Sequence, residues 1–127
     1  MLNPHTINWF EIPVTDLPRA TNFYETMMDM KMEKMEMEDM KMSVFPAEGN
    51  SDFVTVHGSL MLHNNYKPSG DGVLIYLNGG NDLTPYLERA TKAGGKVVMP
   101  KTQIGEHGFC AMFIDTEGNR IGLHSPN

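Results

Sequence analysis

Hydrophobic and polar positions follow the same order twice along the chain. In the first half, β-branched and aromatic residues over 7–14 predict a strand, and an amphipathic stretch over 19–28 predicts a helix. In the second half, residues 73–78 predict a strand and residues 86–93 predict a helix. The chain therefore contains a repeated strand–helix unit.

The boundaries of the two predicted helices carry matching signals. Asp16 and Asp82 are good N-caps, because a short carboxylate accepts the free N–H groups of a first turn. Pro18 and Pro85 stand in those first turns, where no N–H donor is needed. Gly94-Gly95 ends the second helix by supplying a left-handed residue.

Short strands separated by turn residues follow each helix. Each half therefore reads βαβββ, which predicts an α+β domain over residues 1–127, with modules over about 5–64 and 72–125. The linker of residues 64–71 contains Pro68 and Gly70. The predicted strands after the helices cover residues 30–37, 40–45, a stretch between 54 and 63, 96–99 (ended by Pro100), 109–115 and 120–124.

Composition narrows the class of protein. The 127 residues are 40% hydrophobic and 20% charged, which is ordinary for a globular domain and excludes disorder. The net charge of −6 argues against a nucleic-acid partner, which needs a basic surface. No apolar run is long enough for a membrane span, and the N-terminus has no signal-peptide pattern. The lone Cys110 forms no internal disulfide, so we expect a cytoplasmic protein in which this thiol is a small buried hydrophobe rather than a nucleophile.

Methionine is concentrated in one stretch. Eight of the 12 methionines lie between Met27 and Met42, and several alternate with Lys and Glu. One hypothesis is a copper-binding methionine box. The alternation favours another, a half-buried strand pair whose thioethers fill the core while the charges face water. Such thioethers would also make an adjoining cavity wall adaptable.

Several motifs resemble the vicinal oxygen chelate superfamily of glyoxalase I, bleomycin-resistance proteins and extradiol dioxygenases, and more narrowly the small bacterial glyoxalase-related proteins. The resemblance implies two βαβββ modules forming a curled mixed sheet around a cavity, and commonly a homodimer. The residues that carry it are Trp9-Phe10-Glu11-Ile12-Pro13-Val14-Thr15-Asp16, Arg19-Ala20, Phe23-Tyr24-Glu25, Gly94-Gly95-Lys96-Val97-Val98, Gly108-Phe109 and Asp115-Thr116-Glu117-Gly118-Asn119-Arg120-Ile121-Gly122-Leu123.

The resemblance also implies a divalent metal held by four side chains, two from each module. The corresponding positions are Trp9, Met61, Leu74 and Gly122, none of which offers the carboxylate or imidazole that such ions prefer. We therefore expect no metal and no other cofactor. A displaced site would have to use Glu11, His63, Tyr76 or His124, from strands at different heights.

Strand alternation predicts what the cavity holds instead, since side chains two residues apart share a face. Glu11 is the candidate catalytic base of a glyoxalase-like lyase or isomerase, with Arg120 or Tyr76 holding an oxyanion. A structural Glu11–Arg120 ion pair is the other interpretation. The alternative function is non-catalytic sequestration of a small organic molecule, of the bleomycin-resistance kind. The predicted ligand-binding residues are Trp9, Met61, His63, Leu74, Tyr76, Asn78, Arg120, Gly122 and His124.

Overall fold

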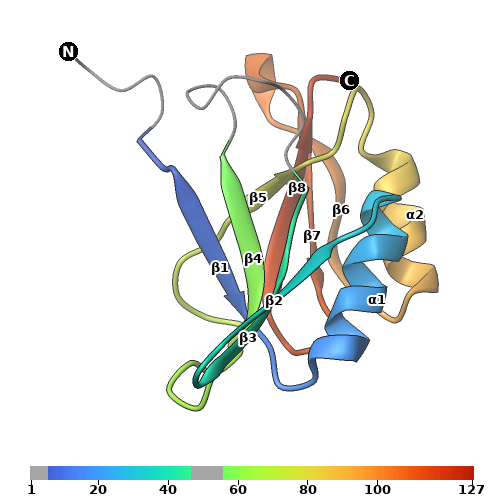
Figure 1. Cartoon of the computed structure of the whole chain (residues 1–127). Helices are drawn as coiled ribbons and strands as arrows, with labels where there is room; N and C mark the ends of the chain where they lie inside the picture. The colour runs from blue at the N-terminus through green and yellow to red at the C-terminus, as the bar shows by residue number, and fades with distance from the viewer. Residues whose placement is uncertain (1–5, 47–55) are drawn as a thin grey trace.

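A computed structural model describes residues 6–46 and 56–127 and contains two four-stranded mixed sheets with two helices (Figure 1). The first module comprises β1 Trp9–Pro13, α1 Leu17–Met28, β2 Glu33–Met37, β3 Met40–Val44 and β4 His57–Leu62. The second comprises β5 Tyr76–Asn78, α2 Thr84–Lys92, β6 Lys96–Gln103, the short helix η1 Gly105–His107, β7 Phe109–Ile114 and β8 Arg120–Ser125. Residues 54 and 55 of the predicted fourth strand lie outside the described residues.

Both sheets have the same strand order. The first runs β1-β4-β3-β2 and the second β5-β8-β7-β6. In each, the first strand pairs in parallel with the last strand of its module, and the other neighbours are antiparallel. This matching topology confirms the predicted α+β class and the βαβββ repeat.

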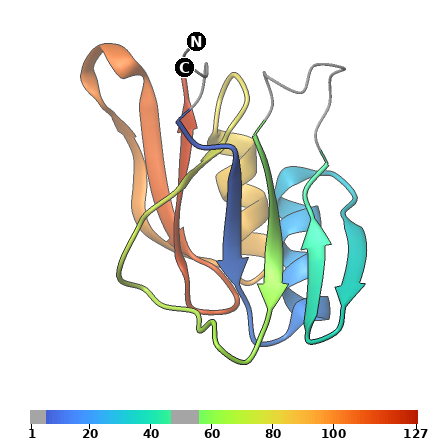
Figure 2. The same ribbon diagram turned by 60° about the vertical axis from the view of Figure 1, so that its left-hand side comes forward.

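Both helices lie on the same side of the sheets, where they contact each other (Figure 2). Side chains from the two modules form one hydrophobic core on that side. No described helix covers the opposite side, which we call the open face (Figure 2). Among the described residues, no helix is long and apolar enough to cross a membrane. The largest fully buried side chains of the core include Tyr24, Phe23, Phe113, Ile12, Met27 and Leu60.

The helix boundaries match the predicted signals in part. Asp16 caps α1, with its Oδ1 accepting the N–H of Arg19 at 3.0 Å. Asp82 accepts the N–H of Thr84 at 2.9 Å, but α2 begins only there, so Asp82 precedes the N-cap position instead of occupying it. Gly94 has a φ of +106°, as expected for the residue that ends the second helix.

Two strands differ in length from their predictions. β6 was expected to end before Pro100 but continues to Gln103. Proline is tolerated because β6 is an edge strand whose register shifts between Met99 and Thr102. β5 is shorter than expected and begins at Tyr76, because residues 73–75 have no strand structure.

The turn between β7 and β8 joins the two modules. The carboxylate of Glu117 accepts the backbone N–H groups of Thr15 and Asp16, both at 2.9 Å, and the Arg19 Nε–H at 2.8 Å. The Asn119 Nδ2–H group donates to the carbonyl oxygen of Pro13 at 2.7 Å. The end of β1 and the start of α1 are therefore held by the second module.

Burial and hydrogen bonds shift two pKa values at this joint. Burial by itself would raise the pKa of Glu117, but the hydrogen bonds from Arg19 and the backbone lower it to about 2. Burial, followed by the negative charge of Asp115, raises the pKa of Tyr24 well above its ordinary value. The Tyr24 hydroxyl donates to Asp115 Oδ2 at 2.6 Å. Both groups therefore keep their ordinary neutral-pH protonation states in the folded protein.

Candidate functional site on the open face

β1 presents alternate side chains to the two sides of the first sheet. Ile12 is buried on the helix side, whereas Trp9 and Glu11 are exposed on the open face. The parallel register places His57 beside Trp9 and Ser59 beside Glu11. The first module therefore contributes an aromatic ring and a carboxylate, each with a polar neighbour on β4.

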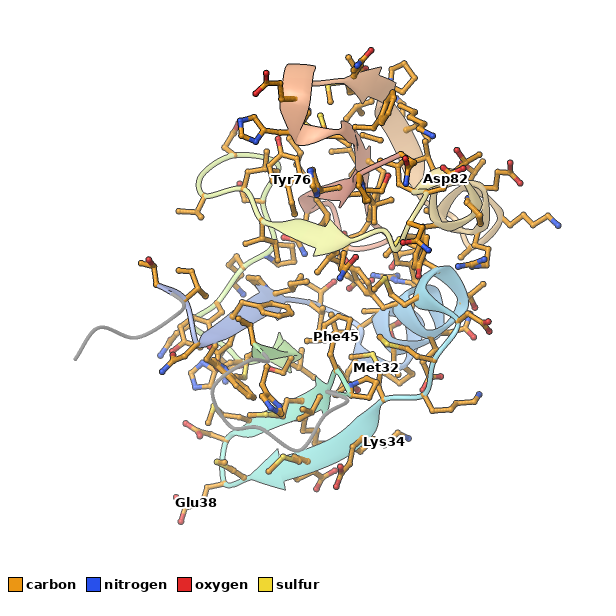
Figure 3. The ribbon with its side chains drawn as sticks, turned by 90° about the horizontal axis from the view of Figure 1, so that it is seen from above. Met32, Lys34, Glu38, Phe45, Tyr76 and Asp82 are labelled. Atoms are coloured by element: carbon orange, nitrogen blue, oxygen red, sulfur yellow. The ribbon has the colours of Figure 1, made fainter. Side chains whose placement is uncertain are left out.

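The second module presents an aromatic ring in the corresponding place. Tyr76 of β5 pairs with Gly122 of β8 and is 47% exposed. A Cβ added at Gly122 would lie 2.4 Å from the Tyr76 ring, so this ring occupies the space above the glycine. Arg120 is two residues before Gly122 and is exposed on the same side. Figure 3 shows Tyr76 at the side of the second sheet nearest the first.

A hollow of about 200 Å³ lies between β1, the linker and the start of β8. Its lining includes the acids Glu11 and Asp71 and the bases Lys67 and Arg120. Ile75 supplies part of an apolar wall. The hollow therefore combines both signs of charge with apolar surface.

Glu11 and Arg120 line this hollow, but no ion pair joins them in the described part of the chain. Glu11 Oε2 instead accepts the indole N–H of Trp9 at 3.1 Å. Arg120 Nε donates to the carbonyl oxygen of Gly70 at 3.3 Å. The structural Glu11–Arg120 ion pair, one of the two interpretations of the sequence, therefore does not form, and both residues line the hollow.

Three of the predicted polar ligand-binding residues make local contacts elsewhere. Asn78 Oδ1 accepts the N–H of Gly80 at 2.8 Å and so shapes the loop before α2. His124 Nε2 donates to the carbonyl oxygen of His107. His63 lies beside the β2–β3 turn, where its Nε2 is 3.3 Å from Asp39 Oδ2. Of the predicted polar set, the structure brings Glu11 and Arg120 together in the hollow and pairs Asn78 with His124 between β5 and β8.

Ser59 is a polar residue that the sequence analysis did not single out. Its side chain is fully buried beside Glu11, and Oγ has no hydrogen-bond partner among the described residues. A buried hydroxyl without a partner costs about 1–3 kcal/mol. Sequence alone could have indicated Ser59 only as a small polar residue in a predicted strand. Its position beside Glu11 depends on the register of the β1–β4 pair, which the sequence does not give.

The donor chemistry at the four family metal positions does not fit a hard divalent cation. Met61 lies level with Pro13 rather than with Trp9, and Leu74 precedes β5. The side chain of any larger residue at Gly122 would meet the Tyr76 ring. Within residues 6–46 and 56–127, no three His, Cys, Asp or Glu side chains gather as a metal-binding group. The residues at these positions therefore do not fit the family's metal, and the expected lack of a cofactor stays a prediction.

The methionines of β2 and β3 do not fill the helix-covered core. Met35 and Met37 are 42% and 52% exposed, and all of β2 is exposed. The prediction that thioethers fill the core is confirmed for Met27, Met30 and Met32, which pack in or against it. It is wrong for the exposed Met35 and Met37, whereas Met42 is buried but lies outside the helix-covered core cluster. Its charged alternates, Lys34 and Glu36, face the helix side at the outer edge of the sheet, where α1 does not reach.

Cys110 is buried on β7, as expected for a small hydrophobe.

The repeated βαβββ order, with both helices on one side of the sheets, is the architecture of the vicinal oxygen chelate fold. A family model for the Glyoxalase/Bleomycin resistance protein/Dioxygenase superfamily matches residues 6–123. The chain therefore belongs to this superfamily.

Relatives and solved structures agree with this assignment. A glyoxylase-like domain-containing protein from Didymella fabae is 32% identical over 117 residues, covering 89% of this chain and 88% of the relative. A fosfomycin resistance protein from Listeria monocytogenes has a TM-score of 0.65 at 16% identity, covering 100% of this chain and 94% of that one. A trypanothione-dependent glyoxalase I from Leishmania major has a TM-score of 0.66 at 19% identity, covering 96% and 87% of the two chains. At these identities the structural matches show the shared fold.

Proposed function

We propose that the open face binds a small organic molecule, held by Trp9 and Tyr76 through its apolar body and by Glu11 and Arg120 through its polar groups. The observation that carries this proposal is the hollow lined by Glu11 and Arg120. The exposed Trp9 ring is hydrogen-bonded to Glu11, and Tyr76 is exposed on the second module. Concave sites that combine apolar surface with a few polar groups are the usual form of a small-molecule site.

Exposure of the two rings supports a ligand with a flat or apolar portion. Trp9 is 42% exposed although its indole N–H is already hydrogen-bonded to Glu11. When a ligand covers an exposed aromatic ring, the buried apolar area makes the free energy of binding more favourable. The unpartnered hydroxyl of Ser59 adds a hydrogen-bonding group under the same face.

Binding without chemistry is favoured by the surroundings of Glu11. A catalytic carboxylate base is usually shielded from water, and Glu11 is exposed in the single chain. The favoured function is therefore binding or sequestration of the ligand without its chemical conversion. Membership of a superfamily that includes glyoxalases does not by itself indicate that this chain is an enzyme.

An isomerase is the second candidate, because Glu11 and Arg120 line one hollow. In that reaction the Glu11 carboxylate takes a proton from a carbon next to a carbonyl group. That carbon carries a hydroxyl group, so the electron pair moves onto the carbonyl oxygen to give an enediolate, which Arg120 stabilises. The hydroxyl proton then passes to this oxygen, and Glu11 returns its own proton to the former carbonyl carbon, so that the carbonyl group has moved by one carbon. Covering of Glu11 by the bound substrate would supply the shielding that the single chain lacks.

Trp9 provides a direct test, since it is the single tryptophan of the chain. A library of small organic acids and planar amphiphiles is screened by thermal shift, and hits are titrated by tryptophan fluorescence. We expect hits to change Trp9 emission and to bind about tenfold more weakly to Glu11→Gln or Arg120→Gln, as for loss of one charged contact. Glu88→Gln on exposed α2 is the matched control. Equal affinity for all four proteins would refute the assigned site.

Turnover separates the two candidates. Each hit is incubated with the protein in deuterated water, and hydrogen exchange at carbon is followed by NMR. Exchange that is lost in Glu11→Gln establishes the isomerase, whereas binding without exchange establishes the sequestering protein.

A further inference from the structure

Four methionines face one another across the β2–β3 hairpin. In the antiparallel register, Met35 lies opposite Met42, and Met37 lies opposite Met40. Residues directly opposite in such a pair have Cβ atoms about 4.5–5.5 Å apart. The two Met-x-Met segments of the sequence therefore form a square of thioethers, which we call the methionine square.

The methionine square lies on the open face. Ser43 points toward α1, because its hydroxyl lies 2.7 Å from the hydroxyl of Thr21. Its neighbour Met42 therefore points the other way, and the other three members share its side through the register and the two-residue alternation. Met61 of β4 pairs with Met42 and extends the row on the same face.

The members of the square differ in exposure in a way that suits a surface site. Met35 and Met37 of β2 are 42% and 52% exposed, whereas Met42 of β3 is buried beside Met61, a neighbour outside the square. The outer thioethers are therefore free to turn, and the inner ones are held in place by their neighbours. Figure 3 shows the hairpin at the outer edge of the first module, with Glu38 at its tip.

We propose that the methionine square binds a soft monovalent metal ion, Cu(I) or Ag(I). Thioether sulfur is a soft ligand that selects Cu(I) and binds hard divalent ions poorly. Exposed acids outnumber exposed bases on this hairpin, and the net negative charge attracts a cation. The acids are Glu33, Glu36, Glu38 and Asp39, and the bases are Lys34 and Lys41. The square includes none of the four family metal positions, although one of them, Met61, borders it, and it shares no residue with the hollow beside Glu11.

The coordination is by sulfur alone. The imidazole considered as a further ligand is that of His63, directly after β4. Its Nδ1 accepts the N–H of Asn65 at 3.0 Å. Its Nε2 then carries the proton and faces Asp39. Neither ring nitrogen is free for a metal, and the sole thiol, Cys110, is buried on the second sheet.

The test is Cu(I) binding measured anaerobically by competition with a chromophoric Cu(I) chelator, with Ag(I) titrated by calorimetry. All proteins carry Cys110→Ser so that no thiol contributes. We expect one ion per chain, and at least about tenfold weaker binding by Met35→Leu/Met37→Leu, which removes two soft ligands. The matched control is Met99→Leu/Met112→Leu, a facing methionine pair on the second sheet, and it should bind as the parent does.

Acidity distinguishes thioether ligands from other donors, because a thioether does not take up a proton. Affinity for Ag(I) should be the same at pH 7.5 and pH 5.5, whereas an imidazole site would weaken as the ring is protonated. Circular dichroism checks that both leucine variants remain folded, as we expect for Met35→Leu/Met37→Leu at exposed positions. No binding by the parent, equal binding by Met35→Leu/Met37→Leu, or loss of affinity at low pH would each overturn the proposal.

Discussion

At the scale of single residues, Glu117 of the second module caps the start of α1 in the first module. Its side chain has no exposed surface and accepts hydrogen bonds from two backbone N–H groups and from Arg19. A carboxylate at the start of a helix is favoured by the hydrogen bonds and by the helix dipole. The Asp-x-x-Gly-Asn turn, which in sequence resembles a family signature, is in this fold a joint between the modules.

Glu117→Gln should lower the free energy of unfolding by about 2 kcal/mol at pH 7. This is less than the free energy that corresponds to the whole pKa shift, because Arg19 is half exposed and water screens its charge. Glu88→Gln on the surface of α2 is the control and should change stability little. Urea denaturation of both variants measures the difference. A Glu117→Gln protein as stable as the parent would show that this carboxylate contributes nothing to the joint.

The same residue gives a pH dependence with a definite sign. The folded pKa of Glu117 is about 2, against an ordinary value of 4.5. Its contribution is therefore fully present above pH 4.5 and is lost as the pH falls toward 2. The stability gap between the parent and Glu117→Gln should shrink over that window. A gap that stays constant from pH 6 to pH 2.5 would contradict the assigned pKa.

At the scale of elements, each parallel strand pair places an aromatic ring over a glycine. Phe10 of β1 covers Gly58 of β4 on the helix side, and Tyr76 of β5 covers Gly122 of β8 on the open face. The two modules use the same pairing on opposite sides of their sheets. In the second module this pairing occupies the fourth family metal position, and in the first it builds the core.

Gly58→Ala should destabilise the protein by about 1–3 kcal/mol, as expected for overpacking. The added Cβ would lie 2.2 Å from the Phe10 ring, which is held against Phe45 at a centroid distance of 5.5 Å. Gly70→Ala is the control, because its nearest atom would be 3.9 Å away. Thermal unfolding compares the two. Equal melting temperatures for both variants would mean that Phe10 moves aside freely.

At the scale of the whole molecule, the open face of the single chain leaves large apolar side chains uncovered. Trp9, Tyr76, Met35 and Met37 are exposed there, and the outer edges of the sheets, β2 and β6, have unpaired strand sides. Uncovered apolar area and free strand edges favour association with a second copy.

We predict a homodimer on these grounds. Light scattering at micromolar concentration should give twice the chain mass of 14.3 kDa. A single species at the chain mass would contradict this prediction, and the open face would then be available to ligands without a partner.

Removal of hard metal ions should leave the fold unchanged. Dialysis against a strong chelator is followed by measurement of the melting temperature and by separate additions of Zn, Ni, Mn and Fe(II). We expect no change, because Trp9, Met61, Leu74 and Gly122 offer no hard donor. A drop of several degrees that stoichiometric metal reverses would reveal a displaced site.

Local pattern was sufficient for most of the fold. Helix caps, turn residues and hydrophobic periodicity act over a few neighbouring residues, so the order of elements and the repeat could be predicted from the chain alone. The predicted end of β6 before Pro100 was wrong. An edge strand tolerates proline, and only the sheet order shows that β6 is at an edge. The alternation on β1 correctly placed Trp9 and Glu11 on the side opposite Ile12.

Which side chains meet was decided by the tertiary structure. The sequence alone determined the identity of the residues on each strand face, since alternation is a property of one strand. Register between strands, and the side on which the helices pack, depend on contacts between distant segments. Those contacts placed Ser59 beside Glu11, separated Glu11 from a direct Arg120 pair, and turned the methionines of the β2–β3 hairpin to the open face.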